Sequence, residues 1–398
     1  MTRIAIWSPN YAPELTGIPP LVTDAAEWLA ERGHHVRVVT AFPNYPSRRI
    51  ELDYRGALWR TEMRNAVRID RSWLRVRPDE SFIDKALYEL TFSTVSLPLA
   101  VRAAQNSDVL VCVVPTLLAA AYSRLIAASL RRLRLVLWVQ DLVAEGAAAL
   151  DLSGMARRAL SLARGIERFA VRGADRVVVC SPGFRDYLTR LAAPAHRIET
   201  IYNWADTDWI APSEHNGGAE SPIRFLYAGN LGYSQGLETL IEAAELAAPR
   251  CVVRIVGDGN AAHAVRAQAA AVKSVVVEPP VPRENYPRLL AEGDVHVVIQ
   301  RRVSAGANLP SKIANYLASG RPIIASIAAD TPAAELLRES GAAILVEPED
   351  PSALAQAMRR LRDDPGLRDE LSRRGRAFAV ERLGRDAALA QLEEAILG

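Results

Sequence analysis

A lysine in the first turn of a short predicted helix is the first residue of this sequence that could do chemistry. Lys312 follows Leu309-Pro310-Ser311, in which Pro310 has the fixed φ of a first helical residue and Ser311 can cap free backbone N–H groups. The N-terminus of a helix carries about half a positive charge, and the lysine adds a full one. The stretch 306–326 therefore predicts an anion site, and an ordinary helix–strand unit with a proline start is the alternative.

A glycine-rich loop is the second candidate for binding an anion. Gly229–Gly236 follows a predicted strand at 224–228 and leads into a predicted helix at 237–246. Its glycines let the backbone approach a phosphate closely, and the helix end directs N–H groups at it. Such a loop can also simply turn the chain. Because both stretches are expected at one edge of a parallel sheet, together they predict a site for a diphosphate.

The charge of a diphosphate indicates which side chains should meet it. Its two to three negative charges exceed what helix ends supply, since each end offers about half a charge. Lys312 is the first candidate cation, and Arg301 or Arg302 is the next. The three cysteines lie in apolar runs and the six histidines have no zinc-binding spacing, so we predict no metal ion.

The elements that position these residues alternate between strands and helices. Buried strands are predicted at 3–8, 35–40, 108–114, 135–139 and 224–228. There are about six strand–helix units before residue 205 and about six after it, with a polar linker at 212–222. The alternation predicts an α/β protein of two doubly wound, Rossmann-like domains that face a cleft between their strand ends.

Two stretches of the front half depart from this rhythm. Residues 58–77 alternate between apolar and basic residues and predict a β-hairpin. Residues 82–104 are apolar but include Lys85 and Glu89. We predict one buried crossover helix there, and a helix that docks on a membrane surface is the alternative.

Composition narrows the class of protein. A chain of 398 residues favours two domains. The net charge of +2 divides into +7 for residues 1–200 and −5 for the remainder. A basic front half indicates either an anionic partner, such as lipid headgroups or a diphosphate-linked acceptor, or a solvated arginine-rich surface. With no apolar run of about 18 residues and no signal-peptide pattern, we expect a cytoplasmic protein with no nucleic-acid partner.

Both anion-site motifs resemble those of retaining glycosyltransferases of family 4, in the branch that builds bacterial surface polysaccharides. The glycine-rich loop has the branch pattern Gly-Asn-x-Gly-x-x-Gln-Gly, and Thr16-Gly17-Ile18 and Phe42–Pro46 resemble two loops of the same family. Two glutamates of the family, one of which grips the nucleotide ribose, fall on Asn315 and Ala307. The helix motif matches at Pro310, Ser311, Lys312, Tyr316, Gly320, Arg321 and Pro322.

The resemblance covers nearly the whole chain and implies the GT-B fold. It implies an acceptor-binding domain at 1–205, a nucleotide-sugar-binding domain at 206–380, and a last helix at 381–398 that crosses back to the first domain. The implied reaction is retaining transfer of a sugar from a nucleoside-diphosphate sugar, with UDP or GDP expected, to a hydroxyl acceptor. The expected acceptor is a lipid-diphosphate-linked saccharide at the cytoplasmic face of the inner membrane. No cofactor beyond this co-substrate is expected.

The resemblance also implies which residues form the site. Asp141 is the candidate for orienting or deprotonating the acceptor hydroxyl, although an aspartate that caps the next turn would look the same. The predicted catalytic residues are Asp141, Lys312 and Gly17. The predicted donor-binding residues are Thr16, Gly17, Gly229, Asn230, Gln235, Gly236, Val281, Arg301, Pro310, Ser311, Lys312 and Asn315. The predicted acceptor-binding residues are Asn44, Tyr45 and Glu145.

Two other functions remain open at this point. A sugar-nucleotide 2-epimerase can share the two-domain design, but it would need acidic and histidine side chains converging on the sugar C2. A nucleotide-sugar-binding protein that has lost transfer is supported by Asn315 and Ala307, which replace the family glutamates. Asn315 can still hydrogen-bond a ribose hydroxyl, which favours an altered grip on the donor over loss of activity.

Overall fold

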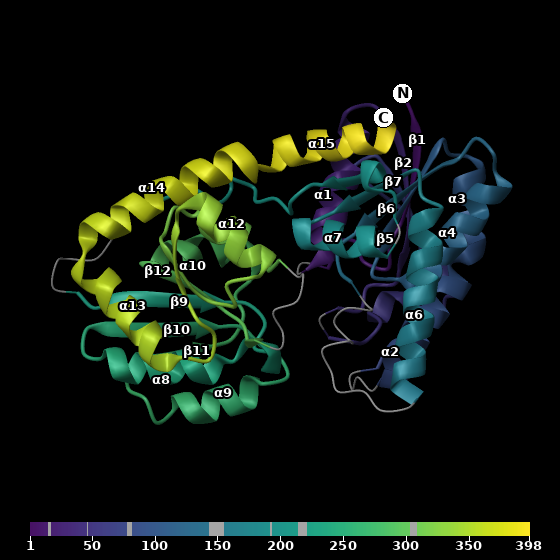
Figure 1. The fold of residues 1–398 in the computed structure, drawn as a ribbon. Coiled ribbons are helices and arrows are strands. Elements are labelled where there is room, and N and C mark those ends of the chain that lie inside the picture. Colours follow the sequence, from purple (N-terminus) through teal and green to yellow (C-terminus); the bar gives the residue numbers. More distant parts are fainter. Residues whose placement is uncertain are drawn as a thin grey trace. The chain divides into compact units, whose positions relative to one another are not determined.

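The chain forms two compact units (Figure 1). The computed structural model describes residues 1–14, 17–45, 47–77, 82–142, 155–191, 193–213, 221–302 and 309–398. The first unit comprises Met1–Tyr202 together with Leu389–Gly398, and the second comprises Asn203–Ala388. The sequence placed the boundary after residue 205 and the returning segment at 381–398, and each unit is described below by itself.

A sheet of eight described strands forms the centre of the first unit, in the order β3-β4-β2-β1-β5-β6-β7-β8. Neighbouring strands pair in parallel except β3 and β4, which are antiparallel. The inner strands are apolar runs that are almost wholly buried, as expected for a parallel sheet covered on both faces. Their bounds are β1 (Arg3–Trp7), β2 (His35–Ala41), β3 (Trp59–Arg64), β4 (Val67–Ser72), β5 (Val109–Val114), β6 (Arg134–Val139), β7 (Arg176–Val179) and β8 (Ile198–Thr200).

Helices cover both faces of this sheet (Figure 1). The helices α2, α3, α4 and α6 lie on one face, and α1 and α7 lie on the other, which is the doubly wound arrangement predicted from the alternation. The bounds are α1 (Ile18–Glu31), α2 (Phe82–Val95), α3 (Leu97–Gln105), α4 (Leu117–Ser129), α6 (Met155–Arg172) and α7 (Pro182–Arg190), with short 3-10 helices η1 (Leu52–Tyr54) and η2 (Ala195–Arg197).

The two irregular stretches of this unit had different outcomes. The predicted β-hairpin at 58–77 is confirmed as β3 and β4, which pair with Thr61 opposite Asp70. The single helix predicted at 82–104 is wrong, because the segment divides at Ser96 into α2 and α3. Pro98 follows the break and has no backbone N–H to continue the ladder, so a new helix starts there. The Ser96 hydroxyl instead accepts a hydrogen bond from Trp7 Nε1 (2.9 Å).

The second unit contains a sheet of six described strands, all parallel, in the order β11-β10-β9-β12-β13-β14. Its core is continuous from β9 and β10 to the helices α8 and α13. The strand bounds are β9 (Ile223–Ala228), β10 (Cys251–Val256), β11 (Val275–Glu278), β12 (Val295–Ile299), β13 (Ile323–Ser326) and β14 (Ala343–Val346).

The helices of the second unit again lie on both faces of the sheet. In Figure 1, α8, α9 and α13 lie on one face, and α10 and α12 lie on the other. The bounds are α8 (Leu237–Ala247), α9 (Ala262–Ala269), α10 (Tyr286–Glu292), α11 (Lys312–Ala318), α12 (Pro332–Ser340), α13 (Pro351–Asp363) and α14 (Pro365–Arg382), with 3-10 helices η3 (Tyr233–Gln235) and η4 (Arg283–Asn285). No helix among the described residues is long and apolar enough to span a bilayer.

The last helix, α15 (Arg385–Leu397), ends in the first unit, which includes Leu389–Gly398. Glu393 accepts a hydrogen bond from Trp28 Nε1 (3.1 Å), forms an ion pair with Arg32, and lies 3.1 Å from His34 Nε2. The guanidinium of Arg134 donates to backbone carbonyls in the last turn of the helix. These contacts hold the end of the chain on the first sheet.

Candidate functional site

The loop between β9 and α8 is shaped by two glycines whose backbones no other residue type adopts readily. Gly229 has φ +146° and Gly236 has φ +68°, and Gly236 is the N-cap of α8. Because neither glycine has a Cβ, the side chains of Lys312 and Arg301 can lie close to the backbone of this loop. This is the loop that the sequence predicted for the diphosphate.

The neighbouring loop between β10 and α9 holds this loop in place. A Cβ on Gly257 would lie 1.8 Å from the carbonyl oxygen of Gly229, so the two backbones touch. Leu231 N–H donates to the Asp258 carbonyl (2.9 Å), and Ala261 N–H donates to the Leu231 carbonyl (2.8 Å). The glycine-rich loop is thus preorganised by backbone contacts.

The ammonium group of Lys312 lies directly against the loop. Its Nζ is 3.1 Å from the position that a Cβ on Gly229 would occupy, and 3.7 Å from the ring centroid of Tyr227. This Nζ is buried and has no hydrogen-bond partner among the described residues. Burial lowers the pKa of Lys312 to about 7. A buried cation with no acceptor is costly to keep, and an anionic ligand would relieve that cost.

Aromatic side chains explain why Lys312 is desolvated. The Tyr316 hydroxyl accepts a hydrogen bond from Ala228 N–H (2.8 Å) and donates to the Ala228 carbonyl (3.1 Å), which fixes α11 to the end of β9. The Tyr227 hydroxyl donates to the Asn230 carbonyl (2.7 Å). Both tyrosines are fully buried, and the Tyr227 ring covers the ammonium group and excludes water from that side.

The start of α11 differs from the prediction in two details. The helix begins at Lys312, so Pro310 precedes the N-cap and is not the first helical residue. Ser311 is the N-cap, but its side chain forms no capping hydrogen bond. Its φ of −58° and ψ of −24° are helical, whereas a capping serine has an extended backbone. The positive charge at this helix start therefore comes mainly from Lys312, and Ser311 does not contribute a side-chain cap.

The two candidate arginines are already paired. Arg301 forms ion pairs with Glu238 and Glu349, and its Nε donates to the Tyr233 carbonyl (2.9 Å). Arg302 forms an ion pair with Glu347 (2.6 Å). Arg301 lies beside the N-terminus of α8, because its Cγ is 3.0 Å from the position of a Cβ on Gly236. A diphosphate would compete with these carboxylates for Arg301, whereas Lys312 is available.

The other predicted donor residues have mixed surroundings. Asn230 is exposed, and Gln235 Oε1 lies 3.3 Å from the Tyr227 hydroxyl, so both border the loop. Asn315 hydrogen-bonds to Tyr286, and Val281 is half-buried before η4. The structure brings together Gly229, Asn230, Gln235, Gly236, Arg301 and Lys312. Thr16, Glu145 and Ala307 lie outside the described residues.

In the first unit, a buried carboxylate that sequence reasoning missed supports the predicted acceptor loop. Glu14 Oε1 accepts hydrogen bonds from the backbone N–H groups of Asn44 and Tyr45, both at 2.9 Å. Burial raises the pKa of Glu14, and these two N–H donors lower it. Asn44 is buried while the Tyr45 ring is 42% exposed, so the loop presents an aromatic face. Gly17, with φ +83°, is the N-cap of the adjacent α1.

Asp141 follows β6, where the sequence placed it. Its Oδ1 accepts a hydrogen bond from Leu142 N–H (2.9 Å), which is the local turn contact that was the alternative to a catalytic role. Asp141 is exposed, but desolvation by the surrounding chain raises the pKa of its carboxyl group, and the Leu142 N–H lowers it. A carboxylate with a raised pKa is a better proton acceptor near neutral pH, so the contact and a basic role are compatible.

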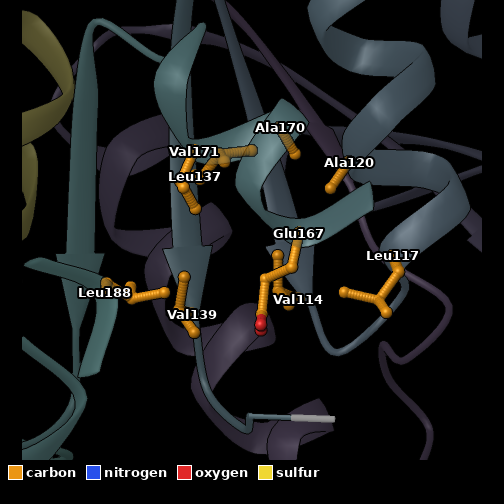
Figure 2. A pocket seen from close by; sticks show the side chains of 9 residues that line it. All are labelled: Val114, Leu117, Ala120, Leu137, Val139, Glu167, Ala170, Val171 and Leu188. Carbon is orange, nitrogen blue, oxygen red and sulfur yellow. The ribbon is translucent and has the colours of Figure 1, made fainter. Parts of the chain in front are cut away.

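The first unit also contains a small cavity, whose lining side chains Figure 2 shows; they come from β5, β6, α4, α6 and α7. Eight of its nine labelled lining side chains are apolar, and the ninth is Glu167. Glu167 Oε2 accepts a hydrogen bond from the Tyr187 hydroxyl (2.9 Å). The cavity volume of about 10 Å³ is that of a single water molecule, so it is too small for a sugar.

Two protein-family models match the chain. A model described as a glycosyl transferase 4-like domain matches residues 16–204. A model described as glycosyl transferases group 1 matches residues 222–364. Each match falls largely within one of the two compact units.

Known proteins are similar over nearly the whole length. WcaI of Escherichia coli K12, a colanic acid biosynthesis glycosyl transferase by name, is 32% identical over 376 residues, which are 90% of this chain and 91% of that protein. Sucrose-phosphate synthase from Thermosynechococcus elongatus superposes with a TM-score of 0.74 at 19% identity, covering 99% of this chain and 98% of that one. Anabaena HepE, solved with UDP-glucose, superposes with a TM-score of 0.70 at 15% identity, covering 99% of each chain.

Proposed function

Because the chain belongs to the family 4 glycosyltransferases and has their GT-B fold, we propose that it is a retaining enzyme of polysaccharide biosynthesis. Its proposed donor is a nucleoside-diphosphate sugar, and its proposed acceptor is a hydroxyl of a lipid-linked saccharide. UDP is favoured over GDP as the nucleotide because the structurally similar HepE binds UDP-glucose. The similarity to WcaI favours a surface polysaccharide as the product.

The unpaired ammonium of Lys312 is the observation that carries this proposal. It lies in a dry site between the Tyr227 ring and Gly229, where a diphosphate could accept its hydrogen bonds. When the sugar–phosphate bond breaks, negative charge develops on the leaving diphosphate. A preorganised cation in a water-excluded site stabilises that charge far more than one in water. The N-terminus of α8 adds backbone N–H groups and its dipole.

The first unit supplies the groups proposed for the acceptor. Asp141 would orient or deprotonate the attacking hydroxyl, and its raised pKa suits a proton acceptor. Tyr45 would lie against a sugar face, on a loop that Glu14 fixes. Gly17 would let the backbone approach the donor closely, because it has no side chain. The proposed route is attack on the same face as the departing diphosphate, without a covalent enzyme intermediate.

A membrane surface is the proposed location of the lipid-linked acceptor. Ile83 on α2 and Met63 on β3 are 67% and 66% exposed, and Trp59 is 47% exposed. Trp59 Nε1 donates to the Val95 carbonyl (2.9 Å), so the hairpin and α2 form one surface. Exposed apolar side chains among arginines suit binding to anionic lipid headgroups.

Release of free nucleotide tests the proposed function. The protein is incubated with a panel of UDP-, GDP- and dTDP-sugars, with and without a membrane lipid extract as acceptor, and free nucleotide diphosphate is measured. We expect one donor to be consumed in an acceptor-dependent way, and the anomeric signal of the product to show retention. An epimerase would change the donor without acceptor, and a binding protein would shift the melting temperature without turnover. Either result would remove the transferase assignment.

A further inference from the structure

A basic hollow lies at the amino-terminal ends of the strands of the first sheet, whereas Asp141 lies at their carboxyl-terminal ends. Arg134 and Arg176 are the first residues of β6 and β7, whereas Asp141 follows the end of β6. Arg131 and Arg132 complete the basic lining of a hollow of about 420 Å³. This volume falls within the range of small-ligand sites, about 300–1,000 Å³. Ligands of parallel sheets normally bind at the carboxyl ends of the strands, so this hollow is separate from the transferase site.

Most guanidinium groups of this hollow have no acceptor among the described residues. The side chains of Arg131, Arg132 and Arg176 form no hydrogen bond or ion pair with any residue that the structure describes. Nε of Arg134 and Nε of Arg176 are buried without an acceptor in the described chain. Elsewhere in the same unit, buried guanidinium groups meet carboxylates, as Arg71 does with Glu62.

The charges of the hollow are poorly balanced. Burial lowers the pKa of Arg134, the positive charge of Arg176 lowers it further, and the Asp175 carboxylate raises it by a smaller amount. The Asp175 carboxylate also lines the hollow, but it accepts a hydrogen bond from Leu135 N–H (2.8 Å). Four guanidinium groups therefore face the Asp175 carboxylate and Gly398 at the end of α15, which leaves the lining with an excess of positive charge. Gathering like charges is unfavourable, and a bound anion would offset it.

Arg134 also shows that the hollow is rigid on one side. Its two terminal nitrogens donate to the carbonyls of Leu397 (3.2 Å) and Ala395 (3.3 Å) at the end of α15. The group is thereby held in one orientation with its Nε still without an acceptor. Arg131 and Arg132 are exposed and can turn toward a ligand without disrupting other contacts.

We propose that Arg131, Arg132, Arg134 and Arg176 form a binding site for a phosphate-bearing ligand with at least two negative charges. Guanidinium groups bind phosphate oxygens in pairs, and several of them suit a multivalent anion better than a single carboxylate. The phosphate belongs either to a free phosphate compound or to an anionic phospholipid headgroup. This site is independent of the donor site at Lys312, and the inference does not depend on the proposed transferase function.

Titration with inorganic pyrophosphate tests the site on the full-length protein. Calorimetry is run at fixed ionic strength, and only the pyrophosphate binding that is lost when arginines of the hollow are replaced is assigned to the hollow. The double variant Arg131→Gln/Arg132→Gln changes two exposed residues, so it should fold normally. The matched control is Arg102→Gln/Arg190→Gln, which removes two exposed arginines of the same unit outside the hollow. We expect the first variant to weaken pyrophosphate binding at least tenfold and the control to change it less than twofold.

Vesicle binding distinguishes the two sources of phosphate. Vesicles of phosphatidylcholine with about 30% phosphatidylglycerol are compared with vesicles of pure phosphatidylcholine, because basic residues bind to an anionic lipid surface. Loss of binding to the anionic vesicles in Arg131→Gln/Arg132→Gln, but not in the control variant, assigns the site to a headgroup. Pyrophosphate binding that depends on these arginines without vesicle binding assigns it to a free phosphate compound. If the two double variants behave alike with both probes, the proposed site does not exist.

Discussion

Replacing Lys312 by methionine should make the protein more stable while removing its donor binding. Methionine has a similar length and no charge, so it fills the space beside Tyr227 without a buried amine. The pKa of Lys312 is about 7 in the folded chain and about 10.4 in an unfolded one. Keeping this group buried at pH 7 therefore costs up to about 4 kcal/mol relative to an exposed lysine. Lys312→Met should recover part of that cost.

The change of this stability gain with pH is a more specific test of the buried lysine than the gain itself. Between pH 7 and about 10 the unfolded chain binds more protons at this lysine than the folded chain, so the wild type becomes more stable as pH rises. The advantage of Lys312→Met should shrink by about 2 kcal/mol from pH 7 to pH 9. Urea unfolding at pH 7, 8 and 9 measures it. Sugar transfer from the proposed nucleoside-diphosphate sugar by the variant should fall about 10²-fold, the scale of one lost charge-stabilising group.

Lys273→Met is the matched control, since Lys273 is an exposed lysine of the same unit. Its effect on the free energy of unfolding should be small and the same at each pH. A Lys312→Met variant that is less stable than wild type at pH 7, or whose advantage does not change with pH, would refute the description of Lys312 as a desolvated amine. Unchanged transfer at saturating donor would remove Lys312 from the donor site.

Three other substitutions test the remaining parts of the account. Asp141→Asn should lower transfer by about 10²–10⁴-fold with UDP affinity unchanged. In the wild type the transfer rate should fall in acid, because the carboxylate is protonated as pH falls through its raised pKa, and the variant should not show this fall. Glu14→Gln should raise the acceptor KM at least fivefold and leave UDP affinity within twofold, because only the Tyr45 loop loses its anchor. Glu393→Ala should lower the free energy of unfolding by about 1–3 kcal/mol, since it leaves Trp28 and its neighbours without an acceptor, whereas the exposed Glu394→Ala should change it by less than about 0.5 kcal/mol.

Much of the fold could be predicted because its strands are buried and apolar. Apolar runs such as Val109–Val114 are stable only as buried strands of a sheet that is covered on both faces. Their alternation with helices implies the doubly wound order. The division of residues 82–104 at Ser96 was missed, because apolar composition does not show where a helix breaks. The Leu97-Pro98 step was the available signal.

The site was predictable in its segments but not in its contacts. The glycines and Lys312 signalled a backbone open to phosphate, and the structure places them together. The pairing of Arg301 with Glu238 and Glu349 joins residues far apart in the sequence, so no local pattern could indicate it. The support that Glu14 gives to Tyr45 was missed for the same reason. Ser311 could not be judged without its backbone angles.

A crystal structure of the protein with UDP tests the central claim most directly. The account predicts phosphate oxygens within hydrogen-bond distance of Lys312 Nζ and of backbone N–H groups between Gly229 and the start of α8. It also predicts that the Tyr227 ring stays beneath the ammonium group. Soaks with GDP and dTDP would rank the nucleotides. Diphosphate bound elsewhere, with Lys312 still buried against Tyr227 and no phosphate beside it, would contradict the account.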